Sequence, residues 1–99
     1  MTKPYEIDEI KNCVVPIARA YGAKRVALFG SYVKGEAKQN SDIDLHIDKG
    51  EIKGFFRLAG FHRELEEKFS VPVDVLTTGA LSDDFLSRIR EEEIVLYEQ

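Results

Sequence analysis

A chain of 99 residues is long enough for one domain with one hydrophobic core, and too short for a second lobe that could enclose a large substrate. Its composition, with 43% hydrophobic and 32% charged residues, excludes a disordered chain, and no signal peptide or transmembrane segment is recognisable, so a cytoplasmic location is the default expectation. The net charge of -4 argues against direct nucleic-acid binding, and a single cysteine, Cys13, excludes an internal disulfide framework.

The chain opens with a predicted helix and a predicted strand. From residue 7 to 21 apolar residues recur at helical spacing, and Gly22 follows as a C-terminal stop. Pro16 lies inside this pattern, so we expect a kink or a new segment there, because proline lacks the backbone N–H. Residues 25–29 (RVALF) then predict a short buried strand that ends at Gly30.

The second predicted strand has an acidic face. Residues 31–41 are too short for a crossover helix, although one helical turn after Ser31 fits. Residues 42–48 (DIDLHID) alternate strictly, which predicts a half-buried strand with three aliphatic side chains on one face. The side chains on the other face are Asp42, Asp44, His46 and Asp48.

The C-terminal half predicts a helix over residues 53–69, a strand over 73–77 and a last helix capped by Ser82. The acidic run at 91–93 is interpreted as a solvated face. The expected fold is therefore α/β (α+β): a small mixed three-stranded sheet with flanking helices, in the order αβ(α)βαβα, in a single domain over residues 1–99.

Connection lengths predict how the strands pair. A link of about a dozen residues between the first two strands favours antiparallel pairing, which brings Gly30 and Ser31 beside Asp42. A full helix between the second and third strands predicts a right-handed crossover and parallel pairing. Asp74, in the third strand, should therefore join Asp42 and Asp44 at one edge of the sheet, beneath the Gly-Ser turn.

Three neighbouring carboxylates suit a divalent cation. Aspartates at i and i+2 of a strand point to one face about 7 Å apart, and without a cation they raise one another's pKa. Oxygen ligands without a thiolate select Mg²⁺, with Mn²⁺ as the alternative. Such ions polarise a phosphate for in-line attack, while Gly30 permits close backbone approach and Ser31 offers a hydroxyl and an amide to phosphate. We interpret the turn as holding a triphosphate and the aspartates as holding its metal.

Four stretches of the chain together resemble a known family. Gly-Ser, ten further residues, Asp-Ile-Asp and a later strand aspartate are similar to the nucleotidyltransferase superfamily of DNA polymerase beta, and in particular to minimal nucleotidyltransferase (MNT) domain proteins. The resemblance covers nearly the whole chain and implies the polymerase beta-type nucleotidyltransferase fold. The stretches that carry it are "YGAKRVALFGS", "GEAKQNSDIDL", "VPVDVLT" and "IREEEIVLYE".

The resemblance also implies a role for each motif residue. Gly30 and Ser31 would contact the nucleotide triphosphate, Asp42 and Asp44 would bind metal and phosphates, and Asp74 would be the third acid. The implied donor is ATP or a similar nucleotide, and the implied reaction transfers a nucleoside monophosphate with release of pyrophosphate.

Some residues depart from the family pattern or have a simpler interpretation. Where the family often has a basic residue after Gly-Ser, this chain has Tyr32, which leaves Lys34 as the cationic phosphate contact unless it is an ordinary solvated lysine. Asp74 is a metal ligand or general base, or else a strand-end aspartate satisfied by water. His46 is a surface histidine, or else contacts a base or sugar of the nucleotide.

Two classes of function follow. MNT proteins resembling this chain commonly accompany a helical HEPN-family toxin, which implies that the chain transfers AMP to a hydroxyl, by preference a tyrosine, of such a partner and so acts as its antitoxin. The alternative is a catalytically weak nucleotide-binding module that masks the partner within a hetero-oligomer. Phe55 and Phe61 are core residues in the first instance, or else part of a partner-binding patch. The sequence does not fix the preferred nucleotide, the acceptor or the oligomeric state.

Overall fold

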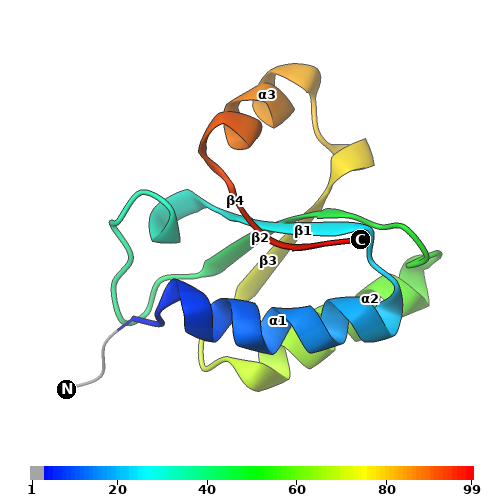
Figure 1. Cartoon of the computed structure of the whole chain (residues 1–99), viewed down its shortest axis with the longest axis horizontal. Coiled ribbons are helices and arrows are strands. Elements are labelled where there is room, and N and C mark those ends of the chain that lie inside the picture. Colours follow the sequence, from blue (N-terminus) through cyan, green and yellow to red (C-terminus); the bar gives the residue numbers. More distant parts are fainter. Residues whose placement is uncertain (1–3) are drawn as a thin grey trace.

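Four strands form one mixed sheet in the computed structural model, which describes residues 4–99 (Figure 1). In spatial order they are β3 (Val73–Thr77), β2 (Ile43–Asp48), β1 (Arg25–Phe29) and β4 (Ile94–Glu98). β1 pairs antiparallel with both β2 and β4, whereas β2 pairs parallel with β3. The predicted pairing of the first three strands is confirmed.

The helices lie on opposite faces of this sheet. α1 (Ile7–Tyr21) and α2 (Phe55–Lys68) cover one face, and α3 (Asp83–Glu92) lies on the other (Figure 1). The hydrophobic core fills the space between the sheet and the α1–α2 layer. Its members without solvent exposure include Ile10, Val14, Val26, Leu28, Ile43, Leu45, Ile47, Phe61 and Leu65.

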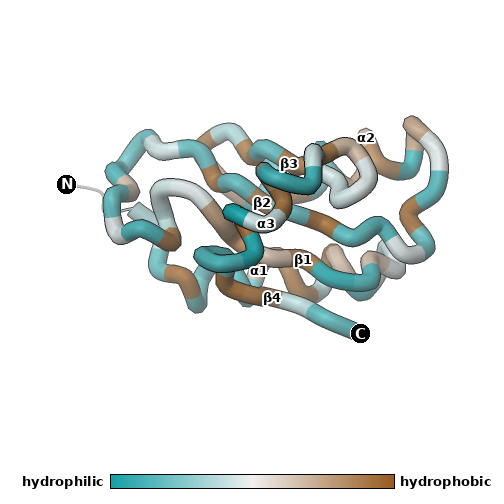
Figure 2. The backbone as a smooth tube through the Cα atoms, turned by 90° about the horizontal axis from the view of Figure 1, so that it is seen from above, coloured by the Kyte–Doolittle hydropathy of each residue, from teal (hydrophilic) through white to brown (hydrophobic). Residues whose placement is uncertain are grey.

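α3 is more polar than α1 and α2. Figure 2 shows it mostly in the hydrophilic colour where it crosses the sheet. Its one buried side chain is that of Ile89, and Phe85 remains 40% exposed. The face of the sheet beneath α3 is therefore not sealed by a second hydrophobic core. No helix within residues 4–99 combines the length and apolar character needed to cross a lipid bilayer.

α1 runs through Pro16 without interruption, so the expectation of a new segment at this residue is wrong. The lost hydrogen bond would involve the carbonyl of Asn12, and both residues are exposed, so that water can hydrate this carbonyl. Gly22 ends the helix as predicted: it has φ 78°, and its N–H points to the carbonyls of Ala18 and Arg19.

The sheet has one strand more than the three predicted. β4 forms the edge beside β1, and only Leu96 of its five residues is fully buried. Ile94 and Val95 are 37% and 41% exposed. A short strand of this kind, directly after an acidic run, lacks the clean alternation that identified β2, because an edge strand buries one face incompletely.

Candidate functional site

Asp44 occupies the centre of the acidic face of the sheet. In the strand register it lies opposite Phe29 of β1 and beside Asp74 of β3. Asp42 precedes β2 by one residue and is exposed, as is Asp74, whereas Asp44 is half-buried. The topology thus brings the three predicted acids to one edge of the sheet, as the connection lengths indicated.

Asp44 is the aspartate of this cluster whose pKa is clearly shifted. Burial raises the pKa of Asp44 to about 6, and a side-chain hydrogen bond with Asp74 and the negative charges of Asp74 and Asp42 act in the same direction. Two carboxylates can form such a bond only when one of them holds a proton. Asp44 therefore holds a proton more tightly than an isolated aspartate does, and a cation bound beside it would offset the repulsion among the carboxylates.

The backbone at Gly30 lies directly against the side chain of Asp44. It has φ 77°, and a Cβ atom at this position would lie closer to Asp44 Oδ2 than van der Waals contact allows. Glycine is required here twice over, by the left-handed backbone and by the neighbouring carboxylate. The turn after β1 and the acid near the start of β2 are consequently in direct contact.

The helical turn expected after Ser31 is present and spans Gly30–Tyr32. Tyr32, the residue that departs from the family pattern, is buried, and its hydroxyl accepts a hydrogen bond from the backbone N–H of Tyr5 at 3.2 Å. This tyrosine anchors the turn to the segment before α1. Ser31 is half-buried and Lys34 is exposed.

The donor set fits a hard divalent cation, since it consists of carboxylates without a thiolate. In the part of the chain that the structure describes, no three His, Cys, Asp or Glu side chains already form a group that could hold an ion. Asp44, beside Asp74 in the strand register, has a pKa that is raised by burial and by Asp74. A bound cation would favour the charged form of Asp44 over the protonated form.

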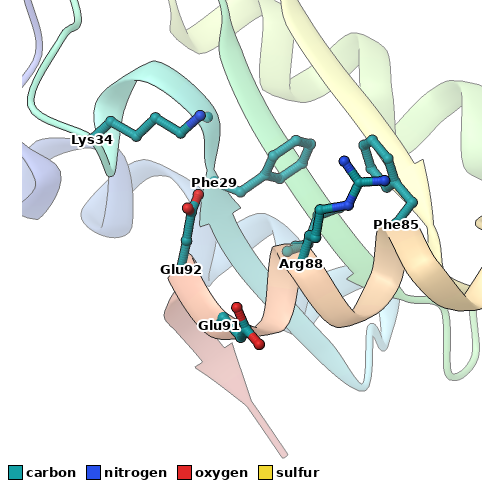
Figure 3. A pocket seen from close by; sticks show the side chains of 8 residues that line it. Phe29, Lys34, Phe85, Arg88, Glu91 and Glu92 are labelled. Carbon is teal, nitrogen blue, oxygen red and sulfur yellow. The ribbon is translucent and has the colours of Figure 1, made fainter.

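A cavity of about 470 Å³ adjoins the acidic edge, between the turn after β1 and α3 (Figure 3). Gly30 belongs both to its lining and to the contact with Asp44. Lys34, predicted to contact phosphate, also lines it. The other lining residues are Phe29, Phe85, Arg88, Ile89, Glu91 and Glu92, of which none had been proposed as a site residue. The sequence signal that could have indicated the lining residues of α3 is the apolar pair Phe85 and Ile89, which are four residues apart and so lie on one face of the helix.

A buried polar network lies on the same face of the sheet, farther along β2. The His46 side chain is 2% exposed, so the prediction of a surface histidine is wrong. Its Nδ1 donates to Glu93 Oε1 at 3.0 Å, and its Nε2 lies 2.8 Å from the Thr78 hydroxyl oxygen. Both ring nitrogens thus contact protein groups rather than a nucleotide.

Glu93 is the anion of this network. Its side chain is 2% exposed and also pairs with Arg25, at 2.8 Å between Nη1 and Oε2. The interpretation of residues 91–93 as one solvated acidic face is therefore wrong for Glu93, while Glu91 and Glu92 are exposed as expected. Glu93 follows α3 directly, and its contacts with Arg25 of β1 and His46 of β2 hold the end of this helix against the sheet.

Other predicted residues lie away from the acids. In the strand register Asp48 lies opposite Arg25, at the other end of β2 from the acids. Lys38, a loop residue for which no site role is predicted, is exposed. Phe61 belongs to the core, whereas Phe55 is 77% exposed, so only Phe55 of the two predicted patch residues lies on the surface. Its neighbour Phe56, 87% exposed, packs edge-on against it.

Comparisons with known proteins agree with this geometry. The family described as "Nucleotidyltransferase domain" matches residues 7–97. A candidate protein adenylyltransferase of Methanocaldococcus jannaschii, MJ0435, is 40% identical over 88 residues, which cover 89% of this chain and 95% of the relative. The protein adenylyltransferase MntA of Thermococcus cleftensis is 30% identical over 74 residues, 75% of each chain.

A solved structure shares the fold at lower identity. It contains a tri-AMPylated HEPN toxin of Shewanella oneidensis in complex with its MNT antitoxin. One of its chains matches with a TM-score of 0.71 and 16% identity, over 93% of this chain and 72% of that chain.

Proposed function

The chain belongs to the nucleotidyltransferase domain family, and we propose from this premise that it is a metal-dependent protein adenylyltransferase. The observation that carries the proposal is the contact of Gly30 with Asp44, which in turn pairs with Asp74. A phosphate-binding turn and a set of carboxylates thus share one edge of the sheet, beside a cavity of a size suited to a nucleotide.

Each residue has a distinct task in the proposed reaction. Gly30 and Ser31 hold the triphosphate of ATP, and Lys34 offsets part of its charge. Asp42, Asp44 and Asp74 would hold Mg²⁺ or Mn²⁺, which supplies charge neutralisation at the α-phosphate and at the leaving group.

The bond changes are those of nucleotidyl transfer. The acceptor hydroxyl oxygen forms a bond to the α-phosphorus, the bond from that phosphorus to its bridging oxygen breaks, and pyrophosphate leaves. The hydroxyl proton moves to a carboxylate, for which Asp74 is placed, since it is exposed and lies beside Asp44 in the strand register.

The acceptor is proposed to be a tyrosine hydroxyl of a HEPN-family toxin, in the cytoplasm, so that the protein acts as an antitoxin. Two findings support this choice: the relatives are named protein adenylyltransferases, and the structural neighbour includes an AMPylated HEPN toxin.

Intact-mass measurement of the HEPN partner tests the proposal. Co-expression with the wild-type chain should add one or more AMP groups to the partner, whereas co-expression with Asp42→Asn should add none. Lys38→Ala, which changes an exposed loop residue outside the cavity, should leave modification unchanged.

A second candidate is inhibition by binding alone, which the exposed Phe55–Phe56 pair favours as a contact surface. This candidate predicts an unmodified partner that is still inhibited by Asp42→Asn.

A further inference from the structure

The cavity beside the acids has two ends of different character. At one end it is lined by Gly30 and Lys34, and Gly30 contacts Asp44. At the other end it is lined by α3, which contributes Phe85 and Arg88 (Figure 3). A donor whose triphosphate lies on the Gly30 turn therefore extends its remaining part toward α3.

The charges around the cavity cancel. Lys34 and Arg88 contribute two positive charges, and Glu91 and Glu92 contribute two negative ones. With Lys34 engaged by the triphosphate, the charges that remain around the cavity are one cation and two anions, which would repel a further phosphate group. The α3 side of the cavity suits an uncharged group with hydrogen-bonding atoms.

The apolar part of the lining is aromatic. Phe29 extends from the end of β1, and Phe85 approaches the same space from α3, with the Arg88 guanidinium beside it in Figure 3. Phe85 is 40% exposed, so its ring face is available to a ligand. Aromatic rings and guanidinium planes stack on nucleobases of every kind.

The α3 wall is held in place independently of any ligand. Glu93, the residue after α3, is fixed by Arg25 and His46, both of which belong to the sheet. Ile89 provides the apolar contact one turn earlier and is 6% exposed. Preorganisation of this kind lowers the ordering cost of binding.

We infer that this cavity binds the base and ribose of the donor nucleotide, with Phe85 as the stacking surface and Arg88 as a second contact on α3. The inference rests on the proposed function and specifies it further: α3 recognises the nucleoside, while the Gly30 turn and the aspartates recognise the triphosphate. The cavity volume of about 470 Å³ lies within the range of small-molecule sites.

Calorimetric titration of two probes, ATP with Mg²⁺ and inorganic tripolyphosphate with Mg²⁺, tests the inference on the purified chain. Phe85→Ala should weaken ATP binding by roughly tenfold or more and leave tripolyphosphate binding unchanged, because only ATP has a base to stack. Phe85→Leu, which keeps an apolar side chain without an aromatic face, should weaken ATP binding in the same direction. Arg88→Ala should also weaken ATP selectively.

Matched controls are available within the chain. Phe56→Ala removes an exposed phenylalanine of α2 outside the cavity, and Arg90→Ala removes an exposed arginine of α3 outside its lining. Neither should alter the affinity for ATP.

Each other outcome has a definite meaning. Unchanged ATP affinity in Phe85→Ala would overturn the inference while leaving the proposed function intact. An equal loss of ATP and tripolyphosphate binding would also overturn it, since α3 would then act through the phosphate site. If the wild type bound neither probe, the proposed function would fail together with the inference.

Discussion

The two faces of the sheet differ in what fills them. Beneath α1 and α2, Ile43, Leu45 and Ile47 of β2 are fully buried in a continuous apolar core. Beneath α3, the alternate residues of the same strand are Asp44, which lies among other carboxylates, and His46, which belongs to a hydrogen-bond network. One six-residue strand therefore supports the fold with one set of side chains and the site with the other.

This comparison predicts opposite outcomes for neighbouring residues of β2. Asp44→Asn should reduce AMP transfer by about a thousandfold or more, because a proposed ligand of the metal and phosphates is lost. It should not lower stability, because a half-buried charge beside other carboxylates is removed. Leu45→Ala should cost about 2–5 kcal/mol of stability through the cavity that it leaves. Urea unfolding and a transfer assay on both variants measure the two effects, and a Leu45→Ala variant as stable as wild type would contradict the division of roles.

Gly30 is expected to affect both the stability of the fold and the candidate site. Gly30→Ala places a Cβ atom against the Asp44 carboxylate and strains a backbone at φ 77°. We expect a loss of about 1–3 kcal/mol in stability together with loss of ATP binding. Gly35→Ala is the control, since it also has positive φ, at 72°, but nothing within 4 Å of the added atom. Equal effects of the two variants on ATP binding would show that backbone strain alone is responsible.

Glu93 tests whether polar contacts on the α3 face also contribute to stability. Glu93→Gln removes the negative charge between His46 and Arg25, and we expect a loss of about 1–3 kcal/mol in thermal or urea unfolding. Glu92→Gln, one residue earlier and exposed, should change stability by less than about 0.5 kcal/mol. If both variants changed the free energy of unfolding by the same amount, Glu93 would not stabilise the position of α3.

The smallest expected effect is a pH dependence that separates stability from activity. Because the folded-state pKa of Asp44 is raised from 3.8 to about 6, the folded chain binds more protons than the unfolded chain between these values. Asp44 therefore makes a destabilising contribution above about pH 6 that is relieved as the pH falls toward 4. Transfer activity should change in the opposite direction and rise with pH toward about 6, because the proposed cation site needs Asp44 in its charged form.

Comparison of wild type with Asp44→Asn isolates this contribution. The stability difference between them should shrink or reverse in favour of wild type on acidification from pH 7 to pH 4. A difference that is independent of pH would contradict the raised pKa.

The sequence predicted the elements whose patterns are local. The alternation of residues 42–48, the Gly22 stop and the connection lengths identified three strands, their pairing and the meeting of Gly30 with Asp44 and Asp74. It did not predict β4, because a half-exposed edge strand shows only weak alternation of apolar and polar residues. It also did not predict the burial of His46 and Glu93, because two partners 47 residues apart leave no local sequence pattern. The cavity lining on α3 was missed for the same reason, since it depends on how α3 lies over the sheet.

The central claim is that the site formed by Asp42, Asp44 and Asp74 transfers a nucleoside monophosphate. The most direct test is to measure which phosphate of labelled ATP becomes attached to the partner. The chain, the proposed HEPN-family partner, Mg²⁺ and ATP are incubated with a label at either the α- or the γ-phosphate. The account predicts α-label on the partner, γ-label only in released pyrophosphate, and no α-label with Asp44→Asn. Transfer of γ-label to the partner, or α-label transfer by Asp44→Asn at the wild-type rate, would contradict it.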